Sequence, residues 1–299
     1  MIGQTLITFR EVLEAALITA IILAYLARTG RVQFSRYVWY GVYTAVAASL
    51  ILGAAVWFAY GALPDATKAL FEAVAAFTAV IVLTSMIFWM ATKGKAIKKE
   101  IERRVKVIVT RGAILALVLF SFIIVFREGL ETVLFLTPTL VTDAAGTIAG
   151  VVVGTLAALA LSYAIFVVGK KISIRKFFYF TSVLLVLLAA GLIGYGVHEA
   201  IEYNKDAGGP DLGWFDDSAY NLGITSDNPF HHKGAIGSVF AVMFGYSANP
   251  EWGRVVFHLA YLVVVLPLVI KVYSPERFSG FVNRVFRLRH SKKAKRGHR

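Results

Sequence analysis

Two copies of one short charged motif lie far apart in an otherwise apolar chain. Residues 9–14 read FREVLE and residues 126–131 read FREGLE, so five of the six positions are identical. At about 100° per residue, the arginine and both glutamates of each copy fall within an arc of about 100° on one helix face. Carboxylate oxygens without histidine or cysteine are ligands that hard cations prefer. The repeated motif therefore predicts a cation site.

The charges of the two copies do not balance. The glutamates are Glu11, Glu14, Glu128 and Glu131, and the arginines are Arg10 and Arg127. Two arginines neutralise only two of the four carboxylates, so either protons or a bound cation must supply the rest. Ferric iron, Ca²⁺ and Mn²⁺ all suit such ligands. The other interpretation is a pair of buried Arg–Glu bridges that fix the packing of two helices.

The elements that carry these motifs belong to a membrane protein. The chain of 299 residues is 58% hydrophobic and only 16% charged, and its mean hydropathy is +0.70, which excludes a disordered chain and argues against a soluble domain. Continuous apolar stretches of about 20 residues predict helices that cross the membrane. We therefore expect an all-α polytopic membrane protein with seven transmembrane helices. They span about 3–27, 37–60, 69–91, 112–137, 145–168, 177–203 and 252–273.

Basic residues predict how this seven-helix transmembrane domain, residues 1–273, is oriented. Twenty-five of the 31 lysines and arginines fall on one side, in the loops after the first, third and fifth spans and from Lys271 onward. The positive-inside rule places that side in the cytoplasm, so the N-terminus is outside and the C-terminus inside. The net charge of +13 is thus explained without nucleic acid. Residues 274–299 form a basic cytoplasmic tail suited to anionic membrane lipids.

The position of the two motifs predicts an inverted repeat. Three spans separate the first and fourth helices, an odd number, so these two helices cross the membrane in opposite directions. Helices 1–3 would then be repeated in helices 4–6, with helix 7 added. Glu11 lies about 12 Å and Glu128 about 15 Å from the outer end of its helix, at 1.5 Å per residue. Both motifs therefore meet near one level, where transporters bind their substrates.

Further acidic and histidine residues gather at the outer ends of the predicted helices. Glu72 begins the third helix, and His198, Glu199 and Glu202 end the sixth. Because these helices are repeat partners, the four residues can surround one outer entrance to the central site. Ordinary interfacial charge explains them equally well. The outer loop, 204–251, is also acidic, and its apolar run of about 234–246 is too short to cross the membrane, so we expect an interfacial or re-entrant segment.

The paired motifs, in the first and fourth of seven helices, resemble the oxidase-linked iron permease family. This family comprises fungal high-affinity iron permeases and bacterial ferrous-iron permeases. Phe71-Glu72, Trp89-Met90, the segment 196–199 and Phe244-Gly245-Tyr246 with Pro250 are similar to landmarks of the family. The resemblance extends to about residue 273. One departure is Val12, where the family usually has glycine after Arg-Glu; Val12 points away from the carboxylates, which predicts altered packing with the site retained.

The resemblance implies iron uptake across the cell membrane, with the motif glutamates as iron ligands and Glu72, His198 and Glu199 on the uptake route. It also implies a separate ferroxidase or an extracellular iron-delivery protein as partner. We expect no permanently bound cofactor, with Fe²⁺ or Fe³⁺ as the substrate, and no nucleic-acid partner. The chain has no P-loop, and it has no cysteine for a thiolate site.

Three alternatives to an iron permease remain at this stage. Similar permeases carry lead or other divalent metals such as manganese. A membrane metalloenzyme would use the same carboxylates but would need an open coordination position beside a base. A proton-coupled carrier would use them to move protons. We expect a transporter and no enzymatic activity.

Overall fold

The computed structural model describes residues 2–93, 97–166, 174–225, 228–231, 234 and 237–273, and within these ranges the chain is helical, without a strand. The long helices are α1 (Ile2–Arg28), α2 (Ser35–Gly61), α3 (Asp65–Lys93), α5 (Ile114–Thr142), α6 (Ala144–Phe166), α7 (Ile174–Asp206) and α9 (Trp252–Tyr273). The shorter helices are α4 (Ile97–Thr110) and α8 (Gly237–Phe244), with single 3₁₀ turns at Val32–Phe34 and Gly213–Phe215. The basic tail expected at 274–299 and the loop lysines Lys170 and Lys171 lie outside the described residues.

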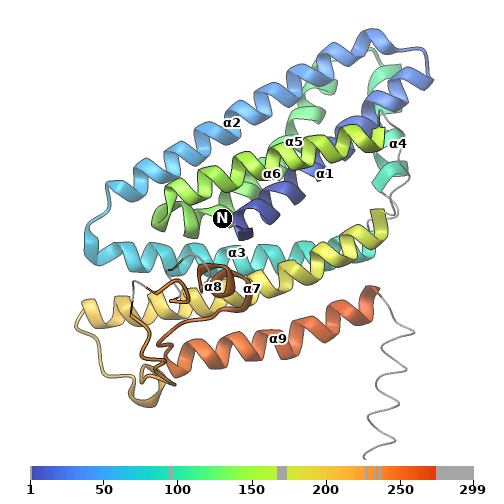
Figure 1. Cartoon of the computed structure of the whole chain (residues 1–299). Coiled ribbons are helices and arrows are strands. Elements are labelled where there is room, and N and C mark those ends of the chain that lie inside the picture. Colours follow the sequence, from blue (N-terminus) through green and yellow to red (C-terminus); the bar gives the residue numbers. More distant parts are fainter. Residues whose placement is uncertain are drawn as a thin grey trace, which may run out of the picture.

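The long helices run side by side, with α2 at one edge of the bundle and α9 at the opposite edge (Figure 1). The most extensive contacts join α2 to α5, α1 to α6, and α3 to α7. If α1, α2 and α3 are matched in order with α5, α6 and α7, the α1–α6 pair corresponds to the α5–α2 pair. The α3–α7 pair then corresponds to itself. Helix α1 also contacts α5, and the two helices run in opposite directions (Figure 1).

A glycine permits close approach in each of the two exchanged pairs. A Cβ atom on Gly154 of α6 would lie 2.6 Å from the backbone oxygen of Thr5 in α1. A Cβ atom on Gly41 of α2 would lie 2.5 Å from the backbone oxygen of Val118 in α5. Small residues let helix backbones approach in membranes, where no hydrophobic effect drives helices together. The two motif helices are thus each fixed against one neighbour.

Five helical segments of the described chain are long and apolar enough to cross a membrane: Val32–Gly61, Thr67–Thr92, Ala144–Phe166, Tyr179–Asp206 and Trp252–Tyr273. Helices α1 and α5, with 27 and 29 residues, are as long as these segments, but the three charges of its motif interrupt the apolar sequence of each. These two helices lie within the bundle (Figure 1), whereas much of the surface of α2 is exposed apolar side chain. The molecule is therefore an integral membrane protein.

Two elements differ from the expected loops and helix ends. The basic segment around 93–110 contains α4, whose Ile101, Val105 and Val109 are buried in a cluster with Leu26 of α1 and Leu117 of α5. The apolar face of α4 therefore packs against other helices of the protein. The other segment, the expected 112–137 span, extends through Pro138 to Thr142, because a helix in an apolar bundle tolerates a proline whose freed backbone groups find other partners.

Candidate functional site

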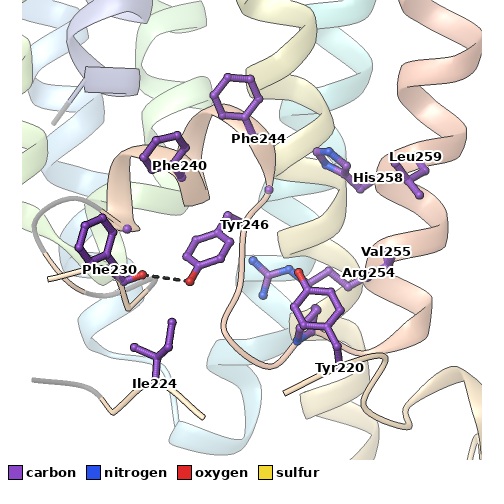
Figure 2. Close-up of a pocket in the computed structure, with 13 residues that line it drawn as sticks. Tyr220, Ile224, Phe230, Phe240, Phe244, Tyr246, Arg254, Val255, His258 and Leu259 are labelled. Carbon is purple, nitrogen blue, oxygen red and sulfur yellow. Dashed lines mark hydrogen bonds between the residues drawn. The ribbon is translucent and has the colours of Figure 1, made fainter. Parts of the chain in front are cut away.

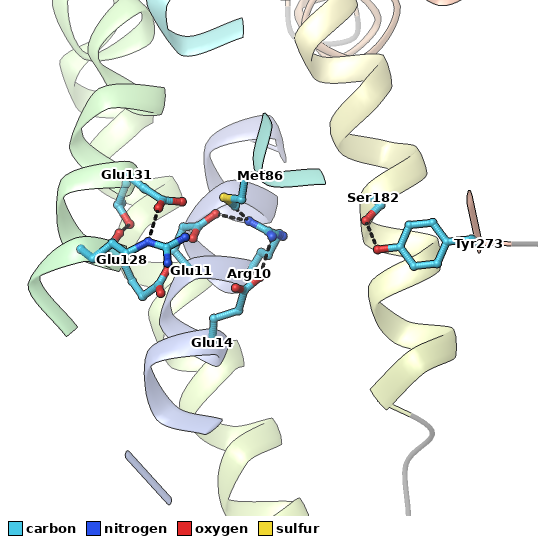
Figure 3. Close-up of polar contacts among 10 residues, drawn as sticks. Arg10, Glu11, Glu14, Met86, Glu128, Glu131, Ser182 and Tyr273 are labelled. Carbon is cyan, nitrogen blue, oxygen red and sulfur yellow. Dashed lines mark hydrogen bonds and ion pairs between the residues drawn. The ribbon is translucent and has the colours of Figure 1, made fainter. Parts of the chain in front are cut away.

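The two motifs meet inside the bundle. Glu11 of α1 and Glu128 and Glu131 of α5 each place a carboxylate oxygen within 4.8 Å of the other two (Figure 3). All three residues are buried, with 1%, 4% and 7% of their surface exposed. Glu14, one turn further along α1, is also buried but lies outside this group of three. We call Glu11, Glu14, Glu128 and Glu131 the central cluster.

Arg10 joins the two carboxylates of the first motif. Its Nη1 lies 2.5 Å from Glu11 Oε1 and its Nη2 lies 2.6 Å from Glu14 Oε1, and only 1% of its side chain is exposed. Nη1 also donates to the sulfur of Met86 on α3 at 3.3 Å. Because each atom of this arrangement is buried, the guanidinium is held in one position between the two glutamates.

Arg127 occupies the equivalent position of the second motif but has different surroundings. Its Nε donates to Glu131 Oε1 at 2.8 Å, while Glu128 forms no ion pair among the described residues. About half of the Arg127 side chain, 47%, is exposed, and its guanidinium carbon lies 4.9 Å from the centre of the Trp89 ring. The repeat in sequence is therefore not a repeat in environment: one arginine is enclosed, and the other lies at the edge of the cluster.

Three buried carboxylate oxygens of the central cluster have neither a hydrogen bond nor an ion pair among the described residues: Glu11 Oε2, Glu128 Oε2 and Glu131 Oε2. An unpaired polar atom in a dry interior costs free energy of about 1–3 kcal/mol, and more when it is charged. Together with four carboxylates against two guanidiniums, this leaves acceptors and negative charge for a cation to satisfy. Oxygen-only ligands suit a hard cation.

Gln4 is a polar residue of the same helix that the sequence analysis did not select. It precedes Glu11 by two helical turns, which places the two side chains within about 20° on one face of α1. Gln4 is 4% exposed, and its Oε1 has no hydrogen-bond partner in the described chain. The sequence signal that could have identified Gln4 is a polar residue inside an apolar span. Met86 had no such signal, because methionine is common in apolar helices.

Glu72 lies near the N-terminal end of α3, where two tyrosines engage it. Tyr60 of α2 donates to Glu72 Oε1 at 2.6 Å, and Tyr195 of α7 donates to Glu72 Oε2. The hydroxyl of Tyr195 also hydrogen-bonds Glu199, which is 8% exposed. The structure therefore joins the expected outer residues Glu72 and Glu199, through a tyrosine that sequence reasoning missed.

His198 and Glu202 complete the outer group. One atom each of His198, Glu199 and Glu202 lie within 4.8 Å of one another. His198 Nδ1 lies 2.9 Å from Glu251 Oε1, and Nε2 lies 3.8 Å from Glu202 Oε2. Although burial opposes the effect, the hydrogen bond and positive charge of His198 lower the pKa of the Glu251 carboxyl below its ordinary range. We call Glu72, His198, Glu199, Glu202 and Glu251 the outer cluster.

The two clusters are separated along the helix axes. Glu72 belongs to the outer cluster, and Met86, fourteen residues later on α3, contacts Arg10 of the central cluster. At 1.5 Å per residue this separation is about 21 Å. A cation that passes from one cluster to the other must therefore travel between them and cannot be shared by both.

Comparison with known proteins places this arrangement in a wider context. The family model described as iron permease FTR1 family matches residues 1–271. An uncharacterized protein of Archaeoglobus fulgidus is 45% identical over 278 residues, which cover 92% of this chain and 96% of that protein. The ferrous iron permease EfeU of Yersinia pestis is 35% identical, with 91% and 93% covered. EfeU of Escherichia coli O6:H1 is 31% identical, with 93% and 98% covered. No solved structure matches the chain.

Proposed function

Because this chain belongs to the iron permease FTR1 family, we propose that it carries iron across the cell membrane through the central cluster. The relatives named as ferrous iron permeases align with this chain over nearly their whole length, which supports iron as the substrate. Glu11, Glu14, Glu128 and Glu131 would be the metal ligands. Members of the family are permeases, so the chain acts as a transporter and not as a metalloenzyme.

The membrane topology we propose has seven spans, formed by α1, α2, α3, α5, α6, α7 and α9. Five candidate spans and the two equally long motif helices support this number. With the N-terminus outside and the C-terminus in the cytoplasm, the basic helix α4 falls on the cytoplasmic side. The exchange of the α1–α6 and α5–α2 contacts supports the inverted repeat of α1–α3 in α5–α7. Residues 1–273 then form the permease domain and 274–299 its cytoplasmic tail.

The observation that carries the proposed ligands is the set of buried carboxylate oxygens that have no partner among the described residues, Glu11 Oε2, Glu128 Oε2 and Glu131 Oε2. A glutamate of a packing bridge would direct its oxygens to the arginines, whereas Glu128 forms no ion pair in the described chain. Intramembrane carboxylates that face one another repel unless a proton or cation lies between them. A cation bound to these oxygens removes both the repulsion and the desolvation cost of the free acceptors.

The outer cluster would collect the cation before it reaches the central cluster. Glu199, Glu202 and His198 offer ligands within 4.8 Å of one another. Glu72 contributes less directly, because both of its oxygens accept hydrogen bonds from tyrosines. Gln4, on the Glu11 face of α1 and toward the outer end of that helix, would supply an oxygen on the way between the clusters. A separate ferroxidase or iron-delivery protein would present the iron.

Uptake of radioactive iron into proteoliposomes containing the full chain tests this function. We expect wild-type protein to take up iron and Glu131→Gln to lose uptake, while Glu100→Gln, the same change at an exposed carboxylate of α4, leaves it unchanged. Supplying Fe²⁺ and Fe³⁺ separately, with Mn²⁺ or Pb²⁺ as competitor, identifies the metal. Uptake with and without a pH gradient distinguishes a proton-coupled carrier. Absence of iron uptake by well-folded wild-type protein would refute the proposal.

A further inference from the structure

A cavity lies beside the outer cluster, between the loop before α8, helix α8 itself and the first turns of α9. Its volume is about 720 Å³. Five aromatic residues supply much of its wall (Figure 2). They are Tyr220, Phe230, Phe240, Phe244 and Tyr246. Such a concave, mainly apolar space with a few polar groups is typical of a small-molecule site.

Arg254 is the cationic group of this cavity. It belongs to the first turn of α9, and its guanidinium points between Tyr246 and Tyr220 (Figure 2). Among the described residues it forms neither a hydrogen bond nor an ion pair, and its Nε is buried without a partner. A guanidinium carries five N–H donors and stays charged, so leaving it unpaired in an aromatic enclosure is costly. An anion that enters the cavity would remove this cost.

The acidic residue closest to Arg254 in the sequence has one oxygen engaged elsewhere. Glu251, three residues before Arg254, directs Oε1 to His198 at 2.9 Å. The other polar group of the wall, His258, uses Nδ1 on the backbone oxygen of Ala190 at 2.8 Å, so its ring is fixed and Nε2 is left to the cavity. Gly245 makes room for this ring: a Cβ there would lie 2.5 Å from His258 Nδ1. The cavity is therefore a preformed space with an unused cation.

We propose that this cavity binds an anionic phospholipid of the outer leaflet, with the lipid phosphate on Arg254 and its apolar part against the aromatic wall. Three features favour a lipid over a free ion. The volume far exceeds what one small anion needs. Phe240, Phe244 and Leu259 at the cavity are exposed, which gives acyl chains an apolar path outward. The N-terminal end of α9, a candidate membrane span, adds its positive dipole end at the depth of lipid headgroups.

Native mass spectrometry of the full chain in detergent, with added phosphatidylglycerol or phosphatidylcholine, tests the proposal. We expect wild-type protein to retain phosphatidylglycerol in preference to phosphatidylcholine. Arg254→Gln should weaken retention by about tenfold, because a charge-assisted hydrogen bond is lost. Phe240→Ala, which keeps the cation but removes part of the wall, should weaken it several-fold. Lys68→Gln, an equal loss of charge near the outer end of α3, is the matched control and should change nothing.

Equal retention of phosphatidylglycerol by wild type and Arg254→Gln would overturn the proposal, as would equal affinity of wild type for the two lipids. Inorganic phosphate is added in a separate series. If phosphate binds in an Arg254-dependent way while the lipid does not, the cavity is a phosphate site and the lipid assignment is wrong. Should Arg254→Gln fail to fold, Phe240→Ala and Arg254→Lys, which keeps the charge but loses the planar fork, decide: unchanged retention by both variants refutes the site.

Discussion

The central and outer clusters contain the same kinds of residue but differ in how their oxygens are used. In the central cluster three buried carboxylate oxygens have no partner in the described chain. In the outer cluster both oxygens of Glu72 accept from tyrosines, Glu199 is bound by Tyr195, and Glu251 Oε1 pairs with His198, so that only Glu251 Oε2 is buried without a partner in the described chain. Composition alone does not distinguish the two clusters, because both consist largely of acidic residues in or near apolar helices.

The difference indicates a division of roles. Where protein donors already satisfy a carboxylate, a cation must displace them, so its net gain in binding free energy is small. Where oxygens are buried and unsatisfied, a cation gains the full interaction. We therefore expect tight, selective binding at the central cluster and weak, reversible collection at the outer cluster. The two motif arginines beside the central cluster also differ, because Arg10 is buried whereas Arg127 is half exposed.

The largest effect is expected from the central carboxylates. Glu128→Gln and Glu131→Gln should each lower the rate of iron uptake by about 100-fold or more, since even an outer-shell partner of a metal ligand is worth about 10–100-fold. Glutamine keeps the volume and one oxygen acceptor but removes the charge. Proteoliposome uptake measures the rate, and circular dichroism verifies helicity. Near-normal uptake by both variants would mean that these residues are packing bridges and that the comparison of clusters fails.

The two motif arginines should differ in their effect on stability. Arg10→Ala leaves two buried glutamates without their partner, so the free energy of unfolding should fall by about 3–5 kcal/mol. Arg127→Ala should lower it by less, because Arg127 pairs with one glutamate whereas Arg10 pairs with two. Thermal unfolding in detergent compares the two. Equal destabilisation would show that the environments of the two copies are equivalent after all.

A smaller effect on transport is expected at the outer cluster. Glu199→Gln or His198→Ala should raise the iron concentration for half-maximal uptake by about fivefold, because the cluster concentrates the cation by its local field. The maximal rate should stay within about twofold, since the central ligands remain. Uptake measured over a range of iron concentrations separates the two quantities. A collapse of the maximal rate would instead make the outer cluster part of the rate-determining site.

The smallest effect concerns the His198–Glu251 pair. The pKa of Glu251 is lowered in the folded chain, so its ionisation stabilises the fold above the ordinary carboxyl pKa of about 4.3, and this contribution is lost as the pH falls through the folded value. Near neutral pH, Glu251→Gln should cost no more than about 1 kcal/mol, because the pair borders solvent. Thermal unfolding should distinguish the variant from wild type at pH 7, and the difference should shrink as the pH falls through the lowered pKa of Glu251. A difference that persists in acid would assign the effect to packing.

Much of the helix plan was predictable because each span is apolar over its whole length. The last helix, Trp252–Tyr273, has the same bounds as its apolar run, and the short segment expected at 234–246 contains α8. Helix ends were less predictable where a local signal conflicted with the apolar setting. Pro138 suggests a helix end near 137, yet α5 continues to Thr142, where Asp143 accepts from the backbone N–H of Gly146 and begins α6.

The sequence by itself determined that Arg10, Glu11 and Glu14 share one face of a buried helix, and likewise Arg127, Glu128 and Glu131, because helical periodicity and the cost of intramembrane charge act within each segment. Only the tertiary structure decided that Arg10 is enclosed beside Met86 while Arg127 lies against Trp89, and that Tyr195 links Glu72 to Glu199. The contacts between different helices join residues 38 to 123 positions apart, and they depend on which helix packs against which. That choice is made by the close fit of whole helices, which no periodicity within a single segment records.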